Sequence, residues 1–115
     1  MQPPDLKLSG EDFASEGYSR DDRAYHLHRL ATASSSLQFS FEAGEKSQAM
    51  NPAFAIDGWG SGGVSLTLNG KPVAEGKDFR VGHTGRLEGI ALVVWIRAQL
   101  IQPTKFGLMS TLKPQ

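Results

Sequence analysis

A repeated alternation of apolar and polar residues, with a period of two, constrains the fold of this chain more than any other feature. The clearest example is SSLQFSFEA, in which Leu37, Phe39 and Phe41 alternate with polar neighbours. Successive side chains of a strand point to opposite faces, so one face of this segment meets a core and the other meets solvent. The pattern predicts a half-buried antiparallel strand.

The same alternation, or a short apolar run bounded by glycine or proline, predicts further strands. They fall in AYHLHRL, AFAIDGW, VSLTL, KPVAEG and KDFRVG, and KFGLMSTL closes the chain. The most apolar segment, IALVVWIRAQL, is expected to be a strand buried on both faces near its centre, with Trp95 in the core. A helix is disfavoured, because the best candidate, residues 10–30, is interrupted by Gly17 and Ser19 and lacks a sustained apolar stripe.

The strongest turn signal lies in LTLNGKPVAEGKDFRVGH. Asn69 and Gly70 tolerate the positive φ angles of a tight hairpin, and Pro72, which lacks an N–H, indicates that the returning strand is at a sheet edge. In the next strand Arg80 is expected to point away from the core, and His83 lies just past the strand's end. We interpret these two residues as a rim or docking contact, and not as a catalytic pair.

Short strands separated by glycine and proline predict an all-β fold. The expected architecture is an antiparallel β-sandwich, Ig-like or jelly-roll-like, with about seven to nine short strands. A length of 115 residues suits a single domain. We expect residues 1–20 to be a flexible or loosely packed N-terminal segment and residues 21–115 to form the sandwich.

Composition excludes several classes of function. The chain has 12 basic and 12 acidic residues, so it lacks the excess positive charge that general nucleic-acid binding or an electrostatic membrane anchor requires. It has no cysteine, which excludes disulfides and thiolate chemistry. The opening MQPPDLKLSG is unlike a secretory signal, and the longest apolar run, IALVVWI, is too short to cross a bilayer. The opening also suits a domain cut from a longer chain, so the sequence leaves the compartment open.

Two histidines raise the question of a metal site. His26 and His28 are two residues apart, so a strand would point both rings to one side, with His83 as a possible third ligand for zinc or copper. The alternative, which we favour, is that both rings line a solvent face.

Acidic residues raise two further questions. No cofactor is expected. Calcium is the alternative, because Asp21 and Asp22 have acidic neighbours, but the regular ligand spacing of a calcium loop is absent and a solvated loop is favoured. Acid–base catalysis would need two facing carboxylates, and the available acids fall in predicted turns or strand ends. The calcium candidates also include Glu11, Asp12 and Glu16; the acid–base candidates are Asp57, Glu75, Asp78 and Glu88.

No catalytic residue is predicted. The sequence has no G-x-S-x-G elbow for a serine nucleophile. The loop GWGSGG lacks the lysine and the following helix of a phosphate-binding loop, so we interpret it as an inter-strand turn.

Trp59 lies between glycines, so its ring is either buried under the loop or displayed on it. A displayed ring would offer a flat apolar surface to a sugar, and neighbouring polar side chains would bond its hydroxyls. The alternative is a buried ring, which is the commoner use of tryptophan. The candidate ligand-binding residues on the first view are Asn51, Asp57, Trp59, Arg80 and His83.

The sequence also carries two resemblances. LTLNGKPVAEGKDFRVG resembles the strand–turn–strand segment of Ig-like modules attached to bacterial polysaccharide-degrading enzymes. More broadly, YSRDDRAYHLHRL, NPAFAIDGWG and GKDFRVGHTGRLEGIALVVWI resemble a C-terminal all-β domain of large bacterial proteins, some linked to polysaccharide breakdown. The resemblance implies a module of a secreted multidomain protein, extracellular or periplasmic, and supplies no catalytic residues.

Three functions follow as hypotheses. The first is a non-catalytic accessory domain that supports the catalytic domain of a carbohydrate-active parent, such as a polysaccharide lyase or glycoside hydrolase, or its substrate surface. The second is an autonomous carbohydrate-binding module, and the third is a small metal protein or enzyme built on the histidines. The expected partners are other domains of the parent and a polysaccharide, without nucleic acid or membrane insertion.

Overall fold

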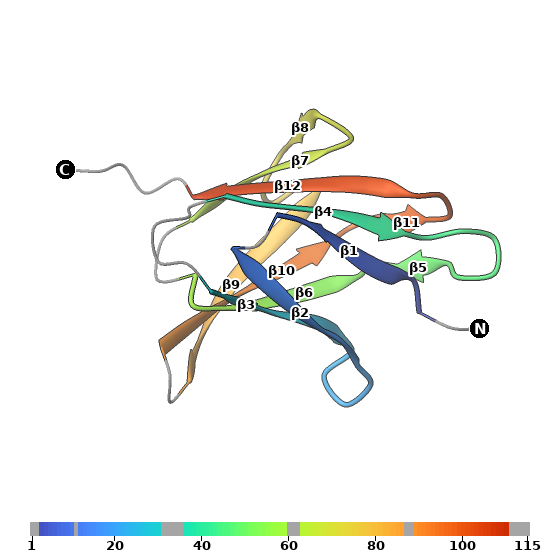
Figure 1. Ribbon diagram of the computed structural model, residues 1–115. Coiled ribbons are helices and arrows are strands. Elements are labelled where there is room, and N and C mark those ends of the chain that lie inside the picture. Colours follow the sequence, from blue (N-terminus) through green and yellow to red (C-terminus); the bar gives the residue numbers. More distant parts are fainter. Residues whose placement is uncertain (1–2, 11, 31–35, 60–62, 87–88, 111–115) are drawn as a thin grey trace.

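β-Strands form all the regular secondary structure in the residues described by a computed structural model, which are 3–10, 12–30, 36–59, 63–86 and 89–110 (Figure 1). The strands are β1 (Asp5–Ser9), β2 (Phe13–Ser19), β3 (Ala24–Arg29), β4 (Ser36–Glu42), β5 (Ala49–Met50), β6 (Ala53–Asp57), β7 (Val64–Leu68), β8 (Lys71–Val73), β9 (Phe79–Arg86), β10 (Gly89–Ile96), β11 (Gln99–Leu100) and β12 (Thr104–Ser110).

These strands form two five-stranded sheets that pack face to face. The first sheet has the order β1-β4-β12-β7-β8, and the second has the order β2-β3-β6-β10-β9. All neighbours are antiparallel except β3 and β6, which run parallel. The short strands β5 and β11 pair with each other beside the sheets. The predicted all-β sandwich is confirmed.

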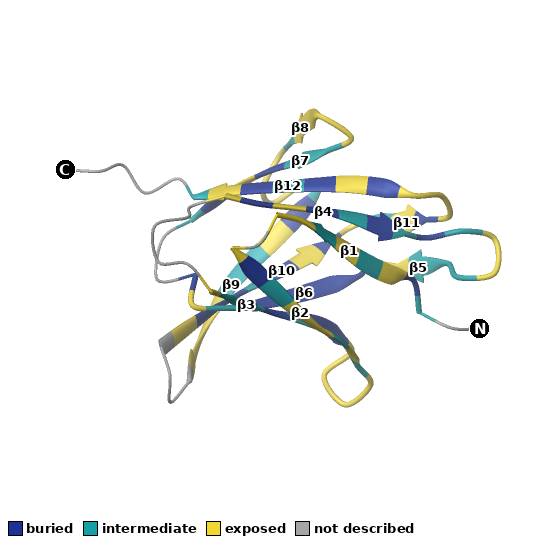
Figure 2. Cartoon of the chain, viewed as in Figure 1, coloured by how far each residue is buried: buried dark blue, intermediate teal, exposed yellow. Residues whose placement is uncertain are grey.

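The core lies between the sheets and is rich in phenylalanine. In β4 the exposed and buried positions alternate as the sequence predicts, with Phe39 and Phe41 turned inward. The rings of Phe39 and Phe106 stack with centroids 4.9 Å apart, and Phe54 from the opposite sheet lies 5.2 Å from Phe106. Figure 2 shows buried segments along the strands and exposed residues at the turns. Burying such a side chain contributes about 1.5–3 kcal/mol, so these rings join the two layers.

The N-terminal segment differs from the expected loose structure. It supplies one strand to each sheet: β1 pairs with β4, and β2 pairs with β3. Phe13 is buried in the common core, and the Tyr25 hydroxyl donates a 2.6 Å hydrogen bond to the Pro4 carbonyl. The sequence conceals this order because β1 is short and β2 contains a bulge near Gly17, which interrupts the alternation. β1 and β2 therefore belong to the sandwich.

The apolar strand β10 also differs from expectation. Leu92, Val94 and Ile96 face the core, whereas Trp95 is 46% exposed on the outer side of the second sheet. The prediction that Trp95 is a core residue is therefore wrong. Alternation turns every second residue of β10 to the outer face, and among the described residues no third layer covers Trp95 there.

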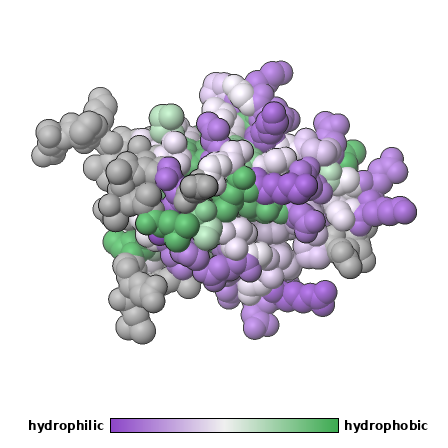
Figure 3. Space-filling model, in the orientation of Figure 1, coloured by the Kyte–Doolittle hydropathy of each residue, from purple (hydrophilic) through white to green (hydrophobic). Residues whose placement is uncertain are grey.

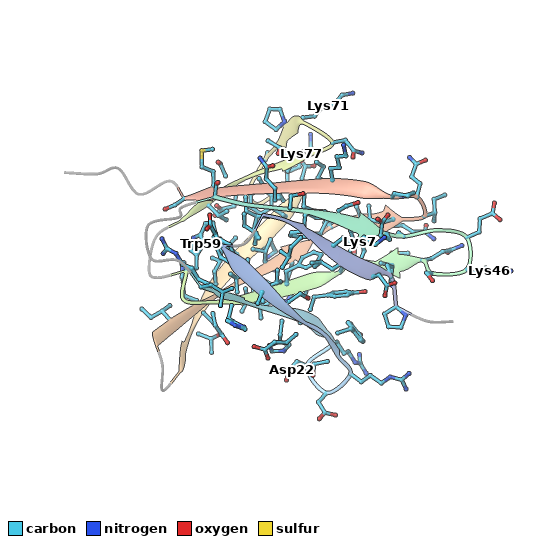
Figure 4. All side chains as sticks on the ribbon, viewed as in Figure 1. Lys7, Asp22, Lys46, Trp59, Lys71 and Lys77 are labelled. Atoms are coloured by element: carbon cyan, nitrogen blue, oxygen red, sulfur yellow. The ribbon has the colours of Figure 1, made fainter. Side chains whose placement is uncertain are left out.

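The predicted hairpin and edge are present in the first sheet. Asn69 and Gly70 have φ angles of 53° and 83°, as a tight turn of this kind requires. β8, which contains Pro72, is the last strand of the sheet, and Lys71 and Lys77 project around this edge (Figure 4). Lysine and proline at an edge discourage pairing with a further strand.

Candidate ligand-binding face

The outer face of the second sheet carries a groove of about 580 Å³. Its floor consists of small outward-facing residues, Ala53 and Ala55 of β6 and Val93 of β10, with Ala24 at the start of β3. The register aligns Ala53 with Trp95 and Ala55 with Val93, so these side chains lie side by side across the sheet. The groove exists because large residues border a strip of alanines.

Trp95 forms one wall of this groove. Its six-membered ring lies against Gly82 of the neighbouring strand, where a Cβ atom would come within 3.1 Å of Cζ3 and 3.2 Å of Cη2. Any side chain at position 82 would therefore displace the ring. The glycine lets a large, half-exposed aromatic ring lie close to the sheet surface.

The opposite wall is polar. Asp22 and Arg23 come from the turn between β2 and β3, and His26 comes from β3. The Asp22 carboxylate lies 2.8 Å from Nε2 of His26, and Figure 4 shows Asp22 on the outer side of the second sheet. Because β6 lies between β3 and β10, the walls stand two strand spacings apart, about 10 Å.

Asn51 and Thr84 add hydrogen-bonding groups to the rim of the groove. Asn51 has a φ of 51°, and its backbone N–H donates to the Ala98 carbonyl at 2.8 Å, which fixes the chain just before β6. Thr84 lies on β9, opposite Ala91. The site thus combines an aromatic wall, a small-residue floor and polar groups on both sides.

The structure separates the five residues that the sequence suggested as a ligand site. Asn51 lines the groove, and Arg80 lies directly opposite Trp95 in the pairing of β9 with β10. His83 pairs with the core residue Leu92, so by strand alternation it belongs to the other side of β9 from Arg80. Asp57 ends β6, two residues beyond Ala55.

Trp59 is not displayed. It is 7% exposed, its ring centroid lies 6.3 Å from that of Phe13, and its Nε1–H donates to the Gly63 carbonyl at 3.3 Å. Figure 4 shows Trp59 at one end of the sandwich. A sugar platform at Trp59 is therefore a wrong prediction, because the ring completes the core. The aromatic residue of this face is Trp95, which the sequence pattern did not identify. Trp95 alternates along β10 with the inward-facing residues Leu92, Val94 and Ile96, so its side chain points outward.

His26 and His28 pair with acids rather than with each other. His26 binds Asp22, and Nδ1 of His28 lies 2.8 Å from a carboxylate oxygen of Glu16. His83 is on the other side of its strand, so the three histidines do not converge. Within the described ranges there is no group of three or more histidine, aspartate or glutamate residues able to hold a metal ion.

The remaining acidic candidates are dispersed. Asp78 accepts a 2.8 Å hydrogen bond from the Ala74 N–H and so closes the turn between β8 and β9, where Glu75 is exposed. Asp12 and Asp21 are exposed in turns. Glu11, Glu88 and the centre of the GWGSGG loop, residues 60–62, lie outside the described residues.

No helix in the described part of the chain has the length and apolar character needed to cross a membrane. Comparison with protein-family models, with curated protein sequences and with solved structures finds no match to this chain. The resemblance to modules of polysaccharide-degrading enzymes stays a prediction, and the groove beside Trp95 is the feature on which a function can be argued.

Proposed function

We propose that this chain is a non-catalytic β-sandwich module, accessory to a larger carbohydrate-active protein, and that it binds a glycan in the groove beside Trp95. One observation carries the proposal: a half-exposed tryptophan lies against Gly82, next to a floor of alanines with hydrogen-bonding side chains on both sides.

The chemistry of the groove suits a sugar ring. A pyranose has an apolar face of C–H groups, which favours contact with the electron-rich face of an aromatic ring. Its hydroxyl groups, directed outward from the ring, can bond the Asn51 amide, the Thr84 hydroxyl and the Asp22–His26 pair. A tryptophan has only two side-chain torsions, so little conformational entropy is lost when it is used for recognition.

The same geometry favours binding without cleavage. Glycoside hydrolysis ordinarily requires two carboxyl groups across the scissile bond, about 5–9.5 Å apart. Among the described residues that line the groove, Asp22 is the one acid, and its carboxylate engages His26. A sugar in this groove would be held against an aromatic wall without a second carboxylate beside it.

The test is affinity electrophoresis and calorimetry against a panel of soluble polysaccharides. Trp95→Ala should weaken binding at least tenfold, since central aromatic contacts commonly contribute more than about 1.4 kcal/mol. Trp59→Phe is the matched control: it alters the other tryptophan, keeps an aromatic ring in the core and should retain binding. In this variant Trp95 is the sole tryptophan, so its fluorescence should shift when the polysaccharide binds.

Two results would overturn the proposal. One is a panel in which no polysaccharide binds the folded wild-type chain. The other is binding that Trp95→Ala leaves unchanged, which would assign recognition to another surface. A face used only for docking to a neighbouring domain would give the first result.

A further inference from the structure

The charged residues around Trp95 carry an inference about the kind of glycan, and it rests on the proposed function. Arg80 is the register partner of Trp95 across the β9–β10 ladder, and both are exposed. Arg97 is two residues beyond Trp95, and its N–H donates to the Asp78 carbonyl at 2.9 Å, so the pairing continues to this point. Strand alternation therefore turns Arg80, Trp95 and Arg97 to the same side.

A third arginine lies on the other side of the groove. Arg23 lines the polar wall and is exposed, with a φ of 55° that turns the chain into β3. Arg23 therefore lines the wall opposite Trp95, and Arg80 is the neighbour of Trp95 on the next strand, with the alanine floor between the two walls.

Two of the acids near these arginines already have partners. Asp22 engages His26, and Asp78 accepts the hydrogen bond from the Ala74 N–H, each at 2.8 Å. Asp21, the remaining acid of the β2–β3 turn, is exposed. In the part of the chain that the structure describes, no ion pair involves Arg23, Arg80 or Arg97. Their guanidinium groups remain available to an incoming anion.

We infer that the groove selects an anionic glycan: one sugar ring contacts Trp95, and its carboxylate or sulfate group is bound by Arg80 and Arg97. Guanidinium groups bind such oxyanions through paired, charge-assisted hydrogen bonds. Arg23, across the groove, would meet the charge of a neighbouring sugar unit along the polymer.

The experiment compares polymers that differ only in charge. Polygalacturonate is measured against the same polymer with its carboxyl groups methyl-esterified, and dextran sulfate against dextran. We expect at least one charged polymer to bind tenfold or more tightly than its neutral counterpart, with the difference shrinking as salt rises. The pair that shows the difference identifies the anion as carboxylate or sulfate.

Matched variants locate the charge recognition. Arg80→Gln combined with Arg97→Gln should abolish most of the preference for the charged polymer while leaving weak binding to the neutral one. Lys7→Gln combined with Lys105→Gln removes the same charge from exposed positions of the first sheet and should leave the preference intact. Circular dichroism checks that all four substitutions leave the fold unchanged.

The outcomes separate the two proposals. Equal binding of charged and neutral polymers, with both dependent on Trp95, overturns the charge selection and leaves glycan binding in place. Loss of the preference in the lysine variant but not in the arginine variant also overturns it, because the charge is then recognised on the other sheet. Absence of binding to any of the polymers overturns both.

Discussion

The surroundings of Trp59 and Trp95 show two opposite uses of the same side chain within one sandwich. Trp59 lies at the end of the layers, 7% exposed, against Phe13 and with its indole N–H bonded to a backbone carbonyl. Trp95 lies on the outside of the second sheet, 46% exposed, against a glycine and beside a groove. The first ring closes the core, and the second forms part of a surface.

The difference in burial between the two tryptophans reflects how many layers cover each ring as well as the local sequence. Trp59 follows a strand whose residues are nearly all buried, and the chain folds it back over the end of the core. Trp95 is in a more apolar segment, yet in the part of the chain that the structure describes no further layer covers its face of the sheet. An apolar neighbourhood in the sequence therefore does not decide the burial of a tryptophan when the strand has two unlike faces.

The largest effect is expected in stability. Trp59→Ala should lower the free energy of unfolding by about 3–5 kcal/mol, because it removes a buried ring and leaves a cavity. Trp95→Ala should lower it by less than about 1 kcal/mol, because the ring is half exposed. Urea unfolding followed by far-UV circular dichroism measures both. Equal losses in the two variants would contradict the contrast between the two rings.

The second effect is in solvent access. With Trp59→Phe, the remaining fluorescence comes from Trp95 and should be quenched strongly by acrylamide and emit at longer wavelength. With Trp95→Phe, the remaining emission comes from the enclosed Trp59 and should be quenched several-fold less. A single quenching constant for the two variants would show that the rings have similar access to solvent.

A smaller effect on the free energy of unfolding is expected from the buried hydroxyl group of Tyr25. Tyr25 is 3% exposed and donates its 2.6 Å hydrogen bond to the buried Pro4 carbonyl. Tyr25→Phe should cost about 1 kcal/mol at neutral pH, because that carbonyl loses its donor. Tyr18→Phe, at a 39% exposed ring that lies 5.0 Å from Tyr25, is the control and should change stability by less than about 0.5 kcal/mol.

The same tyrosine predicts a pH dependence. Burial, followed by the neighbouring Tyr18 and Asp5, raises the pKa of Tyr25 above its ordinary value. The folded chain then holds this proton more tightly than the unfolded chain, so the stabilisation is complete below about pH 10 and declines as pH rises further. Unfolding curves should show the wild-type chain losing its advantage over Tyr25→Phe in this alkaline range. A constant difference between the two at all pH values would contradict the prediction.

The smallest effect concerns the glycine beneath Trp95. Gly82→Ala should change the free energy of unfolding by less than about 0.5 kcal/mol. The Trp95 ring can shift by a few tenths of an ångström, and alanine lowers the conformational entropy of the unfolded chain, which offsets part of the cost. The near-UV circular dichroism of Trp95 should change and polysaccharide binding should fall. Gly85→Ala in the same strand is the control, because a Cβ there meets no atom within 4 Å and should leave the near-UV spectrum unchanged.

Much of the fold could be predicted from local patterns. Alternation fixes the inward side of β4 and β7, and the Asn69–Gly70 pair identifies the hairpin that ends in the edge strand β8. The parallel pairing of β3 with β6 could not be predicted, because the two strands are separated by β4 in the other sheet and no local signal records their alignment. The bulge near Gly17 makes β2 difficult to predict for a related reason. The extra residue shifts the alternation of inward and outward side chains along the strand.

The candidate site could be predicted only in fragments. The sequence predicts Asn51 and Arg80 as ligand-binding candidates together with Trp59, whereas in the structure both lie near Trp95. The groove depends on Ala24, Ala55 and Val93 becoming neighbours across three strands that are not consecutive in the chain. Small residues in a strand carry no signal of their own, so a hollow formed by them becomes visible only when the strands are aligned.

The position of β4 in the first sheet has a mechanical consequence. β1 and β12 flank β4, and each is antiparallel to it, so the two run in the same direction. Asp5 at the start of β1 and Ser110 at the end of β12 therefore lie toward opposite ends of the sheet, as Figure 1 shows. Figure 3 shows hydrophobic residues between the layers on this side of the molecule. A force that pulls Asp5 and Ser110 apart would act parallel to the strands β1, β4 and β12. Since ladder hydrogen bonds lie across the strands, such tension loads the bonds of both ladders together, in shear, instead of opening them one after another.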